Sequence, residues 1–223
     1  MLVELGRHDF SKSTEGGISM YSRETYIHPC RIPGEFRYDI AMIKLPLKID
    51  FNLSGPFVQP ICLPDRCDPI VAHDTSTADG CHTVEMAGWG RRHENGKFVN
   101  LYIETLFNFW NLDQGSSVLQ RATVTLQTRE VCDGYYYSGV HSEYICTTGQ
   151  AKTCEGRNQP NISFINHGEF PGDSGSALMC RNRDLTLSLL GVTAFGGEKC
   201  NEGYPVFSRY FYKKHCLVAQ SFF

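Results

Sequence analysis

The motif Gly172-Asp173-Ser174-Gly175 has the residue types of a nucleophile held in a tight turn. A serine hydroxyl is a poor nucleophile unless a nearby base accepts its proton. In a turn flanked by glycines the hydroxyl can be exposed while backbone N–H groups point towards a developing oxyanion. The motif therefore predicts acyl-transfer chemistry at Ser174, although an ordinary surface turn explains these residues alone equally well.

A second candidate is Asp39, which immediately precedes the apolar run at residues 40–45. An aspartate that enters an apolar strand is expected to be buried, and a buried carboxylate needs a partner. In a catalytic triad that partner is the N–H group of a histidine, which the aspartate holds in the required tautomer. The alternative is an aspartate that only closes the turn before the strand.

Short strands are the elements that we expect to position these residues. Alternating or β-branched runs recur between turn-forming glycines and prolines, whereas helical periodicity is scarce. The expected strands are residues 40–45, 83–87, 119–126, 185–192 and 204–207. This pattern favours an all-β antiparallel barrel or sandwich over βαβ units, with a short C-terminal helix in residues 210–223.

Composition and charge exclude several kinds of partner. The chain has 223 residues, of which 41% are hydrophobic, so it can build one large all-β domain or two small ones. Its formal net charge of −3 offers no basic surface for nucleic acid or for an anionic membrane. No apolar run reaches the roughly 18 residues needed to span a bilayer.

The chain contains ten cysteines, scattered without the spacing of a zinc site. We therefore expect disulfides and an oxidising compartment, with no metal and no cofactor. Sequons at Asn52 and Asn161 fit an extracellular glycoprotein, although such short patterns also arise by chance. Residues 1–7 lack the charged stretch and apolar run of a secretion signal, so we expect that Met1 is not the natural start.

Several motifs follow one another in a specific order, namely residues 60–64, Cys81 with Gly88-Trp89-Gly90, residues 118–122, Cys132, Cys146, residues 172–175 and residues 204–209. In this order the chain resembles the chymotrypsin/trypsin-family serine proteases. The resemblance covers nearly the whole chain apart from two long stretches at residues 95–117 and 155–171. Loops of this length are usually functional or mobile, and an artefact of the gene model is the alternative.

The resemblance implies a chymotrypsin-like pair of antiparallel β-barrels with the site in the cleft between them. Residues 1–65 would form an incomplete N-terminal barrel, and residues 66–223 would contain the linker, the C-terminal barrel and the terminal helix. By position, Asp39 matches the aspartate of the triad and Ser174 its nucleophile. Gly172 and Ser174 match the N–H donors of the oxyanion hole. Asp173 matches the carboxylate that pairs with the new amino terminus after zymogen cleavage.

The same matching implies a disulfide framework. Its pairs are Cys81–Cys180, Cys132–Cys146 and Cys154–Cys200. Cys62 matches a cysteine that bonds the propeptide in many relatives. The cysteines without an implied partner are Cys30, Cys67 and Cys216.

The chain departs from the family most strongly at the catalytic histidine. That residue belongs to an Ala-Ala-His-Cys-like segment upstream of the strand that residues 3–6 resemble, and this segment is absent. We expect the eight histidines of the chain to be surface residues, His28 included. Without a base, the hydroxyl of Ser174 would not be activated. Loss of a triad member typically lowers the catalytic rate by several orders of magnitude.

Further departures concern the substrate cleft, where the resemblance implies a lining of Lys152, Thr193, Ala194 and Phe195. The last three replace a Ser-Trp-Gly wall, and Phe195 could fill the specificity cleft because only glycine leaves room there. Lys152 lies at the base of the primary pocket, which is acidic in trypsin-like enzymes. A preference for arginine or lysine is therefore not supported.

Three hypotheses follow. The first is a secreted serine endopeptidase that forms an acyl-enzyme on Ser174, with this chain inactive as given because the histidine segment is missing. The second is a non-catalytic protease homologue that acts as a binding or regulatory module. The third is a chain that does not fold stably. We favour the first because Asp39 and Ser174 are retained, and expect a protein or peptide substrate, with a propeptide or protease inhibitor as further partners.

Overall fold

The computed structural model describes residues 1–12, 17–63, 81–90, 116–136, 144–149, 173–196 and 204–209. Several predictions lie outside these residues and are not tested by the structure. They concern the C-terminal helix, nearly all of the stretch at 95–117, the whole of 155–171, Lys152, Gly172 and the Cys154–Cys200 pair.

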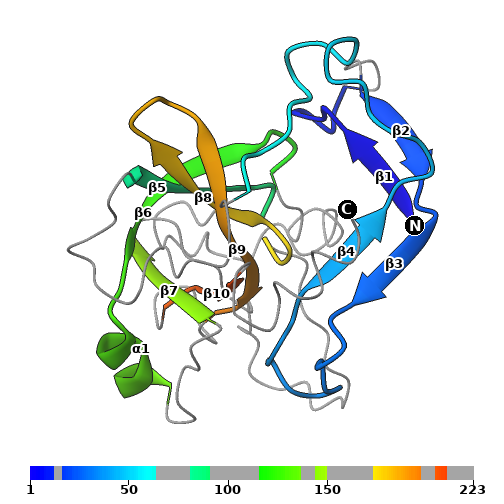
Figure 1. The fold of residues 1–223 in the computed structure, drawn as a ribbon. Helices are drawn as coiled ribbons and strands as arrows, with labels where there is room; N and C mark the ends of the chain where they lie inside the picture. Colours follow the sequence, from blue (N-terminus) through cyan, green and yellow to red (C-terminus); the bar gives the residue numbers. More distant parts are fainter. Residues whose placement is uncertain are drawn as a thin grey trace, which may run out of the picture.

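Six strands close into an antiparallel barrel in the order β10-β7-β6-β5-β8-β9 (Figure 1). Their bounds are β5 (Cys81–Gly88), β6 (Gln120–Leu126), β7 (Tyr144–Gly149), β8 (Ala177–Asn182), β9 (Leu187–Phe195) and β10 (Val206–Arg209). Closure pairs the backbone groups that an open sheet would leave unpaired at its edges. The closed barrel confirms the prediction of an all-β antiparallel fold.

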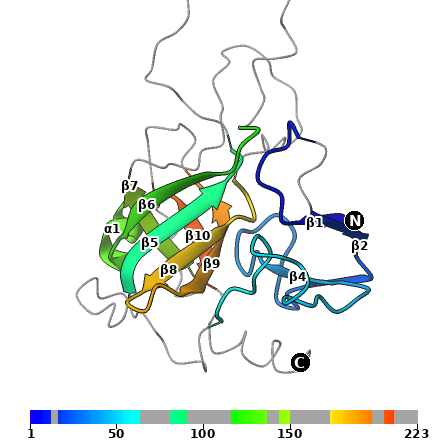
Figure 2. The same cartoon turned by 90° about the horizontal axis from the view of Figure 1, so that it is seen from above.

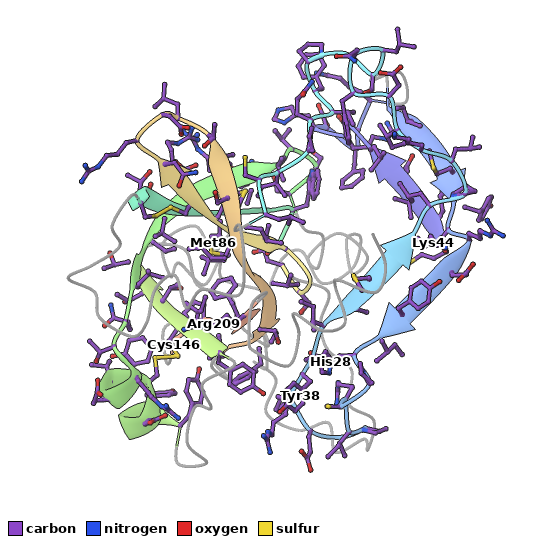
Figure 3. All side chains as sticks on the ribbon, in the orientation of Figure 1. His28, Tyr38, Lys44, Met86, Cys146 and Arg209 are labelled. Carbon is purple, nitrogen blue, oxygen red and sulfur yellow. A yellow bond between two sulfur atoms is a disulfide. The ribbon has the colours of Figure 1, made fainter. Side chains whose placement is uncertain are left out.

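Alternation along the strands puts the apolar side chains of the barrel inside. In β6 exposed residues alternate with Val124 and Leu126, which are both buried. The buried cluster consists of Val84, Met86, Val124, Leu126, Ile145, Leu178, Cys180, Leu190 and Phe207 (Met86 is labelled in Figure 3). Burying one large aliphatic or aromatic side chain contributes about 1.5–3 kcal/mol, so this cluster is the main source of stability in the described residues.

A short helix, α1 (Arg129–Tyr135), packs against the barrel through a second buried cluster. Thr128 caps its first turn, since the Thr128 side chain accepts a hydrogen bond from the N–H of Val131. A disulfide between Cys132 and Cys146 fastens the helix to β7. The sequence did not predict this helix, because seven residues are too few to show helical periodicity.

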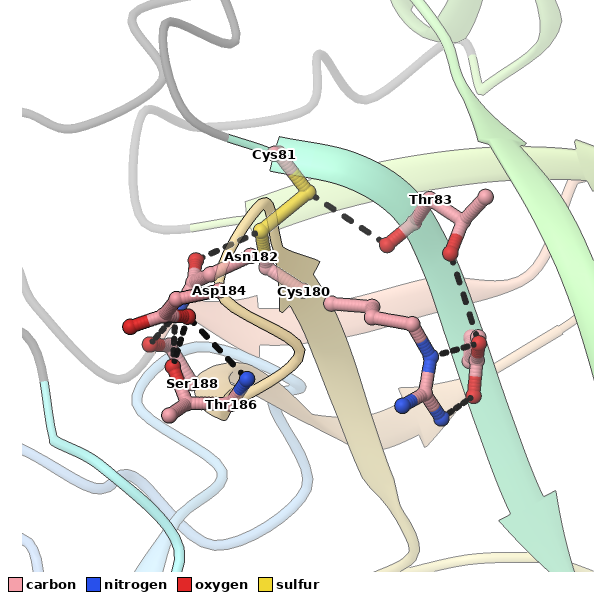
Figure 4. The surroundings of a disulfide bond; sticks show 9 residues. Cys81, Thr83, Cys180, Asn182, Asp184, Thr186 and Ser188 are labelled. Atoms are coloured by element: carbon pink, nitrogen blue, oxygen red, sulfur yellow. Dashed lines mark hydrogen bonds and ion pairs between the residues drawn. A yellow bond between two sulfur atoms is a disulfide. The ribbon is translucent and has the colours of Figure 1, made fainter.

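A second disulfide joins β5 to β8 through Cys81 and Cys180, whose Cα atoms lie 5.5 Å apart (Figure 4). These two bonds are among the three that the resemblance implied. Cys30 and Cys62 are free and exposed.

Beside this disulfide, Glu85 and Arg181 form a two-armed ion pair between β5 and β8, with N–O distances of 2.7 and 3.0 Å (Figure 4). Glu85 is 5% exposed, and Arg121 of β6 approaches it to 3.5 Å. The hydrogen bonds from Arg181 lower the pKa of Glu85, followed by the attraction of Arg121 and Arg181.

The N-terminal half has a different construction. Strands β1 (Leu2–Leu5) and β2 (Ile18–Tyr21) form one two-stranded sheet, and β3 (Glu24–Ile27) and β4 (Ala41–Lys44) form another. Both sheets lie to one side of the closed barrel (Figures 1 and 2). Among the described residues up to 63, the buried side chains are Asp9, His28, Tyr38 and Val58.

Within the described residues, backbone hydrogen bonds join the halves at two places. Residues 8–10 run antiparallel to residues 117–119, with Phe10 N–H donating to the Ser117 carbonyl at 2.7 Å. Further along the chain, Cys62 exchanges hydrogen bonds with Leu187 and Leu189 of β9, both at 2.9 Å. No helix within the described residues is both long and apolar enough to cross a membrane.

The predicted strands correspond to β4, β5, β6, β9 and β10, with shifted ends. Leu185 was placed in a strand, but it lies in the turn before β9 with a positive φ of 69°. The prediction was wrong there because that turn occupies the start of the apolar run. β1 corresponds to the strand that residues 3–6 resemble, whereas the signals for β2, β3, β7 and β8 were not recognised.

Candidate active site

Ser174 lies in a tight turn that leads into β8. The N–H of Ser176 donates to the Asp173 carbonyl at 2.9 Å and closes the turn. Gly175 has a φ of +81°, a conformation that side chains disfavour, so a glycine is required there. Ser174 is exposed, and its hydroxyl makes no hydrogen bond within the described residues.

Thr193 of β9 anchors this turn to the barrel. Its carbonyl accepts the Gly175 N–H at 3.1 Å, and its own N–H donates to the Ser176 carbonyl at 2.9 Å. The hydroxyls of Ser176 and Thr193 lie 2.8 Å apart and are hydrogen bonded. Thr193 is 5% exposed and holds the Ser174 turn; its place in a substrate cleft stays a prediction.

Asp173 is held by a cradle of two glycines. Its Oδ1 accepts the N–H of Gly90 at 2.8 Å. A Cβ at Gly88 would lie 1.8 Å from Oδ1, and a Cβ at Gly90 would lie 2.5 Å from Oδ2. Only glycine therefore fits at either position, which is the physical reason for the Gly-Trp-Gly motif here. The described contact of the Asp173 carboxylate is thus to a backbone N–H, whereas the ammonium of Met1 donates to Ser22 at 3.2 Å.

Asp39 lies at the tip of a three-residue turn before β4. The Ile40 N–H donates to the Tyr38 carbonyl at 2.8 Å, and Tyr38 has a positive φ of 55°. The carboxylate accepts a hydrogen bond from Arg31 Nε at 3.0 Å, and 39% of the Asp39 side chain is exposed. The expectation of a buried Asp39 was wrong, because the turn puts this residue outside the strand.

His28 is buried rather than on the surface, which corrects the prediction for this histidine. It is 7% exposed, and its ring stacks on Tyr38 with centroids 4.9 Å apart (both labelled in Figure 3). Nδ1 accepts the Cys30 N–H at 3.1 Å, so the ring keeps this nitrogen unprotonated. Burial lowers the pKa of His28 because it disfavours the charged form. His28 thus holds the base of the loop that carries Arg31 and Asp39.

The end of β9 meets this loop through aromatic rings. Phe195 packs against Phe36 of the loop at 4.8 Å between centroids. On the barrel side, Tyr136 and Tyr144 contact the same ring edge-on at 5.5 and 5.6 Å. Phe195 is therefore fixed on several sides, and the neighbouring Ala194 is buried.

Thr193 and Phe195 both lie on β9. Thr193 holds the Ser174 turn, and Phe195 packs on the loop that carries Asp39. Within the described residues the ionic partner of Asp39 is a guanidinium, and no group of metal-binding side chains is found there. Sequence reasoning missed Arg31, for which no motif gives a signal. It also missed the role of Gly88 and Gly90, for which the Gly-Trp-Gly motif was the available signal.

Comparisons with known proteins show the family of the chain. The family profile described as Trypsin matches residues 1–215. Ovochymase-2 of Mus musculus is 29% identical over 197 residues, which cover 87% of this chain and 26% of that protein. Coagulation factor XII of Sus scrofa is 27% identical over 212 residues, covering 91% of this chain and 29% of that protein. Serine proteinase stubble of Drosophila melanogaster is 24% identical over 196 residues, or 87% and 20% of the two chains.

Among solved structures, the fold is similar to that of neuropsin, a serine protease expressed in the limbic system of mouse brain. The TM-score is 0.66 at 18% identity, and the match covers 99% of this chain and 78% of that one. The chain spans 20–29% of the length of the curated relatives given above. The profile match over residues 1–215 shows that the chain belongs to the trypsin family of serine proteases.

Proposed function

We propose that Ser174 is the nucleophile of a serine endopeptidase that forms an acyl-enzyme. The observation that carries the proposal is the construction of its turn. Ser174 is exposed, while the residues on both sides are fixed by the Gly90 N–H and by Thr193. An exposed hydroxyl on a turn held at both ends is the arrangement that nucleophilic catalysis requires.

In the proposed reaction the Ser174 hydroxyl attacks the carbonyl carbon of a peptide bond, and an imidazole accepts its proton. Asp39 would hold that imidazole through its other N–H group. The N–H groups of Gly172 and Ser174 would stabilise the oxyanion, although Gly172 lies outside the described residues. The leaving amine takes the proton back from the imidazole, and water then releases the acyl group.

The Asp39 side of this reaction lacks its base in the described structure. Arg31 Nε lies 3.0 Å from the Asp39 carboxylate, where an imidazole N–H would bind in the proposed reaction. A guanidinium remains protonated in proteins and cannot accept the serine proton. We therefore expect the 223-residue chain to be inactive until an imidazole is supplied and Arg31 is displaced.

Imidazole rescue tests this proposal. A fluorophosphonate reacts with an activated serine when an O–P bond forms, the P–F bond breaks and the base takes the proton. We expect background labelling of the unmodified chain. In Arg31→Ala, added imidazole should raise labelling by about tenfold or more, since a proton acceptor typically contributes 10²–10⁴-fold when well positioned. Ser174→Ala should abolish the increase.

Arg37→Ala is the matched control. Arg37 belongs to the same loop, but its guanidinium lies over the Tyr38 ring, 5.4 Å from the ring centre. Removing it should not open the Asp39 carboxylate. Labelling that does not depend on Ser174, or that Arg37→Ala raises as much as Arg31→Ala, would contradict the proposal.

The Arg31–Asp39 pair also favours a second candidate, a non-catalytic homologue that binds a protein or peptide. In such a molecule Arg31 would permanently replace the base as the partner of Asp39. Absence of Ser174 labelling in every arm of the experiment, with the chain shown to be folded, would support this second function.

We also propose an extracellular location, since disulfides persist in oxidising compartments. The Asn52 sequon fits a glycan there, because Asn52 lies on an exposed turn. Proposed partners are a protein or peptide substrate, a protease inhibitor, and a propeptide bonded to the free, exposed Cys62.

A further inference from the structure

Phe10 has a fixed backbone but a half-exposed ring. The backbone is fixed because Phe10 N–H donates to the Ser117 carbonyl at 2.7 Å, and Leu119 N–H donates to the His8 carbonyl at 2.8 Å. The ring is 52% exposed and packs on Trp89, with centroids 4.9 Å apart. Residues 8–10 therefore bring the Phe10 ring into contact with Trp89, which follows β5 of the barrel.

Trp89 is held from both ends by groups around this segment. Its indole N–H donates to the His8 carbonyl at 3.1 Å, and its own carbonyl accepts the Ser116 N–H at 2.8 Å. The ring contact with Phe10 adds to these bonds, since aromatic pairs stabilise beyond the area that they bury. The position of Trp89 is therefore set by residues 8–10 and by Ser116.

The residues on either side of Trp89 form the cradle of Asp173. Gly90 donates its N–H to the carboxylate at 2.8 Å, and neither glycine leaves space for even one added carbon. Because the glycines and the Asp173 carboxylate are packed this closely, a movement of one displaces the other. A shift of Trp89 must move the Gly90 N–H or the carboxylate.

We propose that Phe10 is a positioning residue for the Ser174 turn and acts through Trp89 and the glycine cradle. Asp173 precedes Ser174 directly, and its carbonyl closes the turn by accepting the Ser176 N–H at 2.9 Å. The N-terminal segment thereby stabilises the nucleophile turn, which lies on the barrel. The importance of this positioning for catalysis rests on the proposed role of Ser174, but the order of the turn can be measured without any activity.

Hydrogen exchange and tryptophan emission test the proposal together. The chain has two tryptophans, so in a Trp110→Phe background the emission reports Trp89. In Phe10→Ala we expect a red-shifted emission and about fivefold faster exchange of the amides of Gly175 and Ser176, the change expected from loss of one aromatic pair. Phe10→Tyr keeps the ring and should restore both readings. Phe57→Ala is the matched control, because Phe57 is 85% exposed and has no described ring contact.

Exchange in β8 and β9 shows whether a variant has lost its fold, because the same barrel carries the turn. A shifted emission with unchanged exchange at Gly175 and Ser176 would overturn the proposal, as would equal effects of Phe57→Ala. Gly90→Ala disturbs the cradle with Phe10 intact and should speed exchange of the same amides; an unchanged rate there would also overturn it. Failure of the imidazole rescue would leave these readings unaffected, so the two proposals fail separately.

Discussion

The barrel and the N-terminal hairpins carry the two sides of the site, and they are held together by different means. The barrel is closed, has a continuous buried cluster and contains two disulfides. The described hairpins are two separate sheets, and Ile27 and Tyr21 on them are 67% and 72% exposed. The Ser174 turn is thus built on the closed barrel, whereas Asp39 depends on a loop held by a few polar and aromatic contacts.

This difference explains the contrast between the two acidic residues of the site. Asp173 is fixed by a backbone N–H within a space that admits no added atom. Asp39 is partly exposed and paired with an arginine of its own loop. A preorganised carboxylate needs support from surrounding rigid elements, and in the described residues only the barrel provides it.

Removal of core side chains should give the largest difference between the regions. Leu178 is fully buried in the barrel, so Leu178→Ala should lower the free energy of unfolding by about 3–5 kcal/mol. Leu5 of β1 is only partly buried, and Leu5→Ala should lower it by about 1 kcal/mol, because less apolar area and no closed cavity are involved. Urea unfolding followed by circular dichroism measures both. Equal losses would show that the hairpins are as well packed as the barrel.

The Arg31–Asp39 pair of the N-terminal half and the Arg181–Glu85 pair of the barrel should differ in the same direction. Arg31→Ala removes a half-exposed pair, and such pairs contribute less than about 1 kcal/mol. Arg181→Ala leaves the buried Glu85 with the more distant Arg121 and the Thr83 hydroxyl, so its loss of stability should be about twice as large or more. The midpoints of urea unfolding of the two variants provide the comparison. A larger effect of Arg31→Ala would reverse the proposed ranking.

Acid should destabilise the two regions in different pH ranges. We expect this effect to be smaller than the effects of the substitutions above. Burial keeps the folded pKa of His28 below its ordinary 6.5, so the unfolded loop binds protons more readily, and loop stability falls as the pH drops below 6.5. The pKa of Glu85 is lowered from 4.5, so its contribution is present above pH 4.5 and is lost below it.

Hydrogen exchange measured between these two values should therefore show faster exchange in residues 28–40 and little change in β5. His28→Gln should remove this pH dependence, since the amide oxygen of glutamine can still accept the Cys30 N–H. Acid-induced exchange that begins in β5 would contradict the assignment of the two ranges.

Local signals in the sequence predicted the barrel strands better than the contacts of the site. Apolar alternation marked β5, β6, β9 and β10, because a strand with one buried face repeats every second residue. Asp39 was predicted to be buried because it enters an apolar run, and the turn formed by Tyr38 and Ile40 has no signature such as Asn-Gly to show that Asp39 lies outside the strand.

The remaining contacts of the site depend on residues that are far apart in the chain. Gly90 and Asp173 are separated by 83 positions, so their hydrogen bond exists only once β5 and β8 are paired. Arg31 reaches Asp39 across eight residues of an irregular loop, where no periodic pattern applies. Exposure of Ser174, in contrast, follows from its glycine-flanked turn.

We propose that the turn holds Ser174 in place as a nucleophile, whereas in the described residues Asp39 pairs with Arg31 and not with a base. Hydrolysis of a peptide ester by the purified 223-residue chain tests this most directly, with Ser174→Ala as the blank. The predicted result is the same rate for both proteins. Turnover that requires Ser174 and disappears when His28 or another histidine of the chain is replaced by glutamine would contradict the account.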